Sequence, residues 1–85
     1  MIILPLNSKQ KKYLREYNLT TKYSKQSALF LLNIHHPSLN FEILEPKEFG
    51  TYSFRLDIHY RVIFIFHTPE IIEVIAITNH YHQNT

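Results

Sequence analysis

The spacing of apolar residues changes once along this chain, close to residue 39, and this change constrains the fold more than any other feature. Before it, the residues expected to face the core recur every three to four positions, as on one buried face of an α-helix; they are Tyr23, Ser27, Phe30, Leu31 and Ile34. After it, apolar and polar residues alternate, as in a strand with one buried face. The sequence therefore predicts helices first and strands second.

The predicted elements follow the order β-α-α-β-β-β-β. The first strand contains Pro5, which cannot donate a hydrogen bond and so indicates an edge strand or a strand end. Asn7 or Ser8 is expected to cap the first helix, and Thr20 or Thr21 the second. The expected ranges are strand 2–6, helices 8–17 and 20–34, and strands 39–43, 52–56, 60–66 and 71–78, with a tight hairpin at 57–59.

Such an order is typical of an α+β fold. We expect an N-terminal edge strand, two helices and a four-stranded antiparallel meander with the helices on one face. At 85 residues the chain has room for a single domain, 1–85.

Composition excludes several kinds of chemistry. The chain has no cysteine, so disulfides, zinc–thiolate sites and thiol nucleophiles are excluded. Its histidines do not show the HExxH or HxxxH spacing of a helical metal site, and we expect neither a metal nor a cofactor. No apolar run approaches the length of a signal peptide core or a membrane span, which favours a soluble, cytoplasmic protein without a membrane partner.

Positive charge is concentrated in the first part of the chain. Residues 1–34 carry six Lys or Arg and one acidic residue, which gives a net charge of +5. Residues 35–85 carry three Lys or Arg and six acidic residues, which gives a net charge of −3. A basic front end suggests an anionic partner, such as nucleic acid or an acidic protein segment. A solvated lysine-rich helix face would give the same pattern, and both interpretations stay open.

Two arginines are expected on the sheet face that the helices leave open. Tyr52, Phe54 and Leu56 should face the core, which turns Ser53 and Arg55 to the other side. Arg61 lies among apolar residues, where an arginine is costly unless it reaches a polar group or an anion. The pair is therefore either a phosphate clamp or a set of ion pairs with carboxylates, of which Asp57, Glu42 and Glu73 are the candidates.

Further residues complete a potential set for RNA cleavage. His80 can donate a proton near neutral pH, Tyr81 can stack on a base, and Glu42 can act as general base. Plain surface exposure is the more common role for a terminal histidine and for a glutamate on the polar side of a strand. Together with the two arginines they would provide a base for the 2′-OH, cations for the phosphorane and an acid for the leaving oxygen, without a metal.

Three segments resemble the RelE/ParE superfamily of toxins from toxin–antitoxin pairs. They are Y-S-F-R-L-D-I-H-Y-R-V-I-F (52–64), I-E-V-I-A-I-T-N-H-Y (72–81) and the helix-to-sheet junction H-P-S-L (36–39). The resemblance covers the whole chain by element order and particular residues only between 36 and 81. The superfamily contains both ribonucleases and gyrase poisons.

The resemblance implies roles for individual residues. Arg61 matches the arginine that binds the scissile phosphate in the ribonuclease branch, and Arg55 matches a second basic residue. His80 and Tyr81 match the terminal His-Tyr pair of YoeB-like members, in which the histidine is the general acid. Glu42 falls near their general base. The expected additional RNA contacts are Ser53, Lys47, His59 and His82.

The leading hypothesis is therefore a toxin that cleaves messenger RNA on the ribosome and that a cognate antitoxin holds inactive, with a heterotetramer as one form of that complex. The lysines that RelE uses in the strand 52–56 are not present, since Ser53 occupies one of those positions, so a YoeB-like mechanism fits better. The alternative is a ParE-like inhibitor that binds DNA gyrase without catalysis. A third hypothesis is an inactive member that only binds its partner.

Overall fold

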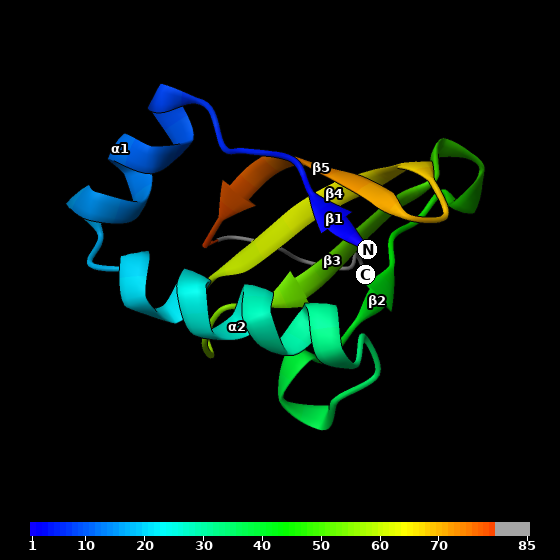
Figure 1. The fold of residues 1–85 in the computed structure, drawn as a ribbon, viewed down its shortest axis with the longest axis horizontal. Coiled ribbons are helices and arrows are strands. Elements are labelled where there is room, and N and C mark those ends of the chain that lie inside the picture. Colours follow the sequence, from blue (N-terminus) through cyan, green and yellow to red (C-terminus); the bar gives the residue numbers. More distant parts are fainter. Residues whose placement is uncertain (80–85) are drawn as a thin grey trace.

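The computed structural model describes residues 1–79 and places them in a five-stranded sheet with two helices (Figure 1). The elements are β1 (Ile2–Ile3), α1 (Ser8–Glu16), α2 (Thr20–Leu32), η1 (Pro37–Leu39), β2 (Glu42–Ile43), η2 (Lys47–Phe49), β3 (Thr51–Arg55), β4 (Arg61–Thr68) and β5 (Ile71–Thr78), where η denotes a short 3₁₀ helix.

The strand order is β1-β5-β4-β3-β2. β1 is an edge strand that runs parallel to β5, and the remaining neighbours are antiparallel. The α+β class, the N-terminal edge strand and the antiparallel meander predicted from the sequence are confirmed. α2 lies across one face of this sheet, while α1 lies beside the end of β5 (Figure 1).

Helix α1 begins with a reciprocal cap. Asn7 Oδ1 accepts a hydrogen bond from the backbone N–H of Gln10 at 2.7 Å, and Gln10 Oε1 accepts one from the N–H of Asn7 at 3.0 Å. Both groups would otherwise lack a partner at a helix N-terminus. Of the two caps considered for this helix, Asn7 is therefore the one used. Leu14 is the only buried residue of this largely polar helix.

Helix α2 buries most of the predicted face: Phe30 is buried, and Tyr23, Ser27 and, just after the helix, Ile34 are half-buried. The buried face also includes Gln26, which is only 6% exposed, and excludes Leu31, which is 45% exposed, and in this it differs from the apolar pattern. The amide of Gln26 donates hydrogen bonds to the backbone carbonyls of Ser38 and Arg55, which makes its burial possible. The expected caps, Thr20 or Thr21, are also wrong, because the helix starts after Leu19 without a side-chain cap.

The core is built around three phenylalanines whose rings contact one another. Phe30 of α2 lies 5.1 Å from Phe54 of β3 and 5.2 Å from Phe64 of β4, measured between ring centroids. All three are fully buried. Burial of one such side chain contributes about 1.5–3 kcal/mol, so this contact fixes α2 against the centre of the sheet.

The strand expected over 39–43 is mostly irregular. Leu39 ends the 3₁₀ helix η1, and only Glu42 and Ile43 pair with β3. Between them Asn40 has a φ of 44°, a left-handed conformation that asparagine tolerates better than most residues. The turn at Asn40 stops the strand from extending back to Leu39, although Leu39 itself is fully buried.

Candidate active site

Arg61 is the most firmly held charged residue on the sheet face opposite α2. It is the first residue of β4 and is only 8% exposed. Its Nε donates a hydrogen bond to Ser53 Oγ at 2.9 Å, and one Nη donates to the backbone carbonyl of Asn40. Glu42 Oε2 lies 3.9 Å from the same guanidinium. The guanidinium is therefore fixed by two neutral oxygens, with a carboxylate just beyond hydrogen-bond distance.

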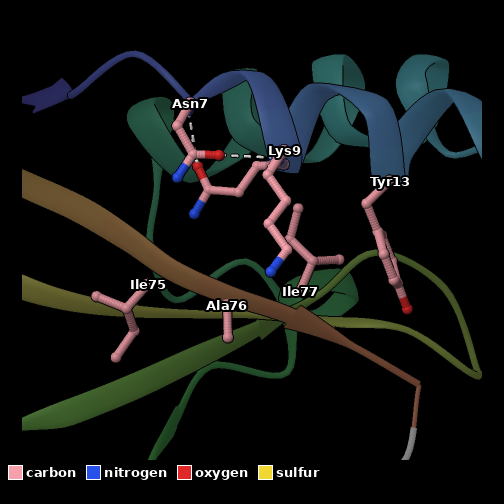
Figure 2. A pocket seen from close by; sticks show the side chains of 7 residues that line it. Asn7, Lys9, Tyr13, Ile75, Ala76 and Ile77 are labelled. Atoms are coloured by element: carbon pink, nitrogen blue, oxygen red, sulfur yellow. Dashed lines mark hydrogen bonds between the residues drawn. The ribbon is translucent and has the colours of Figure 1, made fainter.

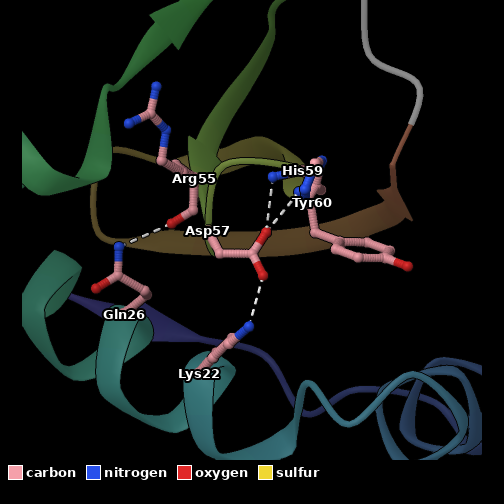
Figure 3. A network of polar contacts seen from close by, with 6 residues as sticks. All are labelled: Lys22, Gln26, Arg55, Asp57, His59 and Tyr60. Carbon is pink, nitrogen blue, oxygen red and sulfur yellow. Dashed lines mark hydrogen bonds and ion pairs between the residues drawn. The ribbon is translucent and has the colours of Figure 1, made fainter.

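Arg55 and Arg61 are directly opposite each other across β3 and β4. Opposite residues of an antiparallel pair project from the same face of the sheet. Figure 3 shows the side chain of Arg55 pointing away from α2. The side-chain amide of Gln26 in α2 donates a hydrogen bond to the backbone carbonyl of Arg55 at 2.8 Å. The structure thus brings together the two arginines that the sequence singles out.

Glu42 reaches the same face from β2, because it is the strand partner of Ser53. Its carboxylate accepts a hydrogen bond from the side-chain amide of Asn40 at 3.3 Å, and its side chain is 33% exposed. Glu42 therefore lies beside Arg61 with part of its surface open to solvent. We refer to Glu42, Ser53, Arg55 and Arg61 as the arginine site.

Ser53 has a different place from the one expected. The sequence predicts that it contacts RNA on an open face, but in the structure it is fully buried. Its hydroxyl accepts the hydrogen bond from Arg61 Nε. In this conformation Ser53 positions Arg61 and is not itself available to a ligand.

Lys47 and His59 lie at opposite ends of β3. His59 belongs to the hairpin between Arg55 and Arg61, so it is exposed at the same end of the sheet as the two arginines. Lys47 belongs to η2, which precedes Thr51 at the other end of β3, and that end is about 13 Å from Arg55 along the strand. The structure places His59 near the arginine site and Lys47 away from it.

His80, Tyr81 and His82 lie outside the described residues. The structure does place the strand that precedes them, because Thr78 at the end of β5 is the strand partner of Arg61. Thr78, which precedes His80 by two residues in the sequence, therefore lies beside Arg61.

The hairpin that carries His59 is anchored to α2 through Asp57 (Figure 3). The carboxylate of Asp57 accepts hydrogen bonds from the backbone N–H groups of His59 and Tyr60, at 2.8 and 2.9 Å, and from Lys22 Nζ at 2.7 Å. Burial alone would raise the pKa of Asp57, but these hydrogen bonds outweigh it and hold the pKa below its ordinary value. Asp57 is thus paired with Lys22 and not with an arginine.

Among the carboxylates considered as ion-pair partners of the two arginines, all of which lie within residues 1–79, only Glu42 is close to one of them. Of the three candidate carboxylates, Asp57 is bound to Lys22 and Glu73 lies 2.7 Å from His67. Glu42 is the remaining candidate, and it approaches Arg61 no closer than 3.9 Å. One guanidinium beside a carboxylate, with a second arginine on the same sheet face, can bind a phosphate while the carboxylate accepts a proton from a nearby hydroxyl.

Asn40 and Gln26 take part in this arrangement, and neither was predicted from the sequence. Asn40 provides a carbonyl to Arg61 and an amide to Glu42, and Gln26 holds the carbonyl of Arg55. An asparagine just before a strand is a recognisable candidate for a left-handed turn, which was an available signal. A glutamine on a helix gives no comparable signal, because its usual place is the solvent.

The arrangement of β1, two helices and a β2–β5 meander is the fold of the RelE/ParE-like toxins. Among solved structures, the chain is similar to the YoeB/ParE toxin from Agrobacterium tumefaciens, with a TM-score of 0.69 and 17% sequence identity. The match covers 95% of this chain and 100% of that toxin. The resemblance inferred from the sequence motifs is therefore confirmed for the fold.

Sequence comparison adds nothing to this structural match. No protein-family profile matches the chain, and no curated protein matches it in sequence. Within residues 1–79, neither helix has the length and apolar character needed to cross a membrane.

Proposed function

We propose that this chain is the toxin of a type II toxin–antitoxin pair and that it cleaves messenger RNA without a metal. Glu42 takes the proton of the 2′-OH, Arg61 and Arg55 stabilise the charge on the phosphorane, and His80 protonates the 5′-leaving oxygen. Tyr81 orients the RNA beside it, while His59, Lys47 and His82 supply further contacts. A cytoplasmic antitoxin keeps the toxin inactive, and the substrate is the mRNA on the ribosome.

The observation that carries this proposal is the fixed position of Arg61 next to a carboxylate. Two hydrogen bonds hold its guanidinium 3.9 Å from Glu42, on the sheet face that also carries Arg55. A protein that only binds a partner has no chemical need for a base beside such a cation. A reaction through a phosphorane needs both, because charge develops on the phosphate oxygens while a hydroxyl loses its proton.

Inhibition of DNA gyrase is the second candidate function. The similar solved structure is described as a YoeB/ParE toxin, a name that joins the two classes. The fold is compatible with both, so the choice depends on the chemistry of the arginine site.

One experiment separates the two functions. The chain is expressed under induction, and both the 5′ ends of transcripts and the breaks in DNA are mapped. New 5′ ends within reading frames support the ribonuclease. Double-strand breaks with intact transcripts would establish the gyrase inhibitor instead.

The variant Arg61→Lys tests whether cleavage depends on the arginine site. Lysine keeps the charge but lacks the planar fork that bonds Ser53 and Asn40, and loss of one transition-state donor typically lowers the rate by ~10²–10³. Arg15→Lys is the matched control, since Arg15 is an exposed residue of α1. Cleavage by Arg61→Lys at the rate of the control would refute the role of Arg61.

A further inference from the structure

A cleft lies between α1 and β5, apart from the arginine site. It has a volume of about 260 Å³. Figure 2 shows Ile75, Ala76 and Ile77 along its floor, with Lys9 and Tyr13 reaching down from α1. We call these five residues the tyrosine cleft.

The cleft is open because β1 is so short. β1 pairs only with Ile71 and Ile72 of β5, so within residues 1–79 no strand covers the outer edge of β5 beyond them. One backbone group of this edge is satisfied by Gln10, whose side-chain amide donates a hydrogen bond to the carbonyl of Val74 at 2.9 Å. The floor beyond that contact is apolar, and Ile75 is 45% exposed.

Lys9 places a positive charge over this apolar floor. The other polar residues that line the cleft, Asn7 and Gln10, are bound to each other in the helix cap. Across residues 1–79, Lys9 has no ion pair, whereas Lys12 of the same helix lies 3.9 Å from Glu16. A ligand that fits both features has an apolar body and a negative charge.

Tyr13 forms the wall of the cleft and is supported by two further tyrosines. Its ring centroid lies 4.6 Å from that of Tyr17 and 6.4 Å from that of Tyr60. Burial raises the pKa of Tyr13, and so do the two neighbouring phenols, so its hydroxyl stays protonated. Within the described part of the chain none of the three hydroxyls has a hydrogen-bond partner, which leaves them available to a ligand.

We propose that the tyrosine cleft is a nucleobase-binding subsite for single-stranded RNA, with one base against Tyr13 and a neighbouring phosphate at Lys9. Bases of single-stranded RNA are commonly bound by stacking on tyrosine, with basic side chains along the backbone. An acidic peptide would satisfy Lys9 but has no flat aromatic group to match Tyr13.

This subsite rests on the proposed ribonuclease function and extends it. Both sites use β5: Ala76 lies in the cleft, and Thr78 is the strand partner of Arg61. The two positions are about 7 Å apart along the strand. RNA bound at Arg61 therefore has the cleft within reach around the uncovered edge of β5, and the cleft selects the base at a fixed distance from the cut.

The test measures binding of a short single-stranded 2′-O-methyl RNA, which lacks the 2′-OH needed for cleavage. Tyr13→Leu keeps an apolar side chain under α1 but removes the stacking ring, and loss of one stacked base weakens affinity about 5- to 100-fold. Ile75→Glu places a carboxylate on the floor at an already exposed position and should weaken binding as well. Thermal unfolding checks that both variants fold.

Charge is tested with a matched pair. Lys9→Gln should lower the slope of log Kd against log salt by about 0.7, the value for one phosphate contact on a single strand. Lys22→Gln removes the same charge but should leave the slope unchanged, because Lys22 is already bound to Asp57 at 2.7 Å.

The outcomes separate this subsite from the proposed function. If Arg61→Lys abolishes cleavage while Tyr13→Leu, Ile75→Glu and Lys9→Gln all bind RNA as the wild type does, the subsite is refuted and the ribonuclease stands. If the wild type neither binds the RNA nor cleaves transcripts, both fail. If the cleft variants weaken binding of a purified antitoxin but not of RNA, the cleft is a protein-binding surface and the subsite is refuted.

Discussion

Arg61 owes its position to Ser53, a residue with no charge and no exposed surface. Arginine has a long, flexible side chain, and holding it in one place costs conformational entropy. The hydrogen bond from Nε to Ser53 Oγ, at 2.9 Å, restricts that freedom before any ligand arrives. A preorganised donor needs little rearrangement when charge develops on a substrate.

Ser53→Ala should therefore reduce cleavage although Ser53 touches no substrate. A hydrogen bond to a charged group is worth about 1.5–3 kcal/mol, and its loss corresponds to a rate about 10- to 100-fold lower if Arg61 is displaced. The rate of RNA cleavage measures this effect. Ser27→Ala is the control, because the hydroxyl of Ser27 bonds only to carbonyls within α2. Equal rates for the two variants would mean that Ser53 does not position Arg61.

His80 and His82 offer a second test at the level of single residues. If His80 is the general acid, His80→Gln keeps a polar side chain of similar reach but cannot deliver a proton near neutral pH. Positioned proton transfer is typically worth ~10²–10⁴-fold, so His80→Gln should still bind RNA and cleave it that much more slowly. His82→Gln should have a small effect. The reverse order would show that the alignment of the terminal His-Tyr pair is wrong.

The residue types of the arginine site were predictable from the sequence, but its internal contacts were not. Arg61 stands out because an arginine within an apolar strand needs a polar partner. Strand alternation then puts Arg55 and Ser53 on the same face. The backbone carbonyl of Asn40 was not predictable, since it depends on a left-handed turn that ends the expected strand early.

Among the elements, the hairpins were predicted more accurately than the helix faces. β5 has the predicted bounds, 71–78, and β3 and β4 differ by a few residues. Alternation of apolar residues determines both the period and the buried face of a strand. The buried face of a helix is predicted less accurately from apolar spacing. In α2 the buried Gln26 and the exposed Leu31 both depart from the apolar pattern.

The contact between α2 and the hairpin predicts a pH-dependent stability. Because the pKa of Asp57 is lowered in the folded state, its stabilising effect is complete above the ordinary value of 3.8 and is lost as pH falls through the lowered folded value. Asp57→Asn should lower the free energy of unfolding by about 1 kcal/mol or less at neutral pH, since Lys22 is half exposed. This difference from wild type should vanish in strong acid.

Denaturant unfolding at neutral pH and in strong acid measures this difference. The amide oxygen that Asp57→Asn introduces can still accept the hydrogen bonds from the hairpin N–H groups, so the variant isolates the charge. Lys22→Gln and the double variant complete a mutant cycle. A difference that stays constant across this pH range would show that the charge of Asp57 does not contribute to stability.

At the scale of the whole molecule, the basic charge is spread over the two helices and is only partly neutralised. Lys12 lies near Glu16, and Lys22 is bound to Asp57. Lys11 and Lys25 carry the same positive charge as Lys12 and Lys22 but have no ion pair within residues 1–79. The net +5 of residues 1–34 therefore overstates the charge available to a partner, and the unpaired lysines should dominate attraction of an anionic surface.

Two double variants with the same change in net charge test this distinction. Lys11→Gln with Lys25→Gln removes unpaired lysines, and Lys12→Gln with Lys22→Gln removes paired ones. The affinity for ribosomes, or for a purified antitoxin, is measured over a range of salt concentrations. The first double variant should bind more weakly and with a shallower salt dependence, because exposed unpaired charges contribute most to counterion release. The second should stay close to wild type. If affinity does not depend on salt in any of the three proteins, these lysines only keep the chain in solution and play no part in recognising a partner.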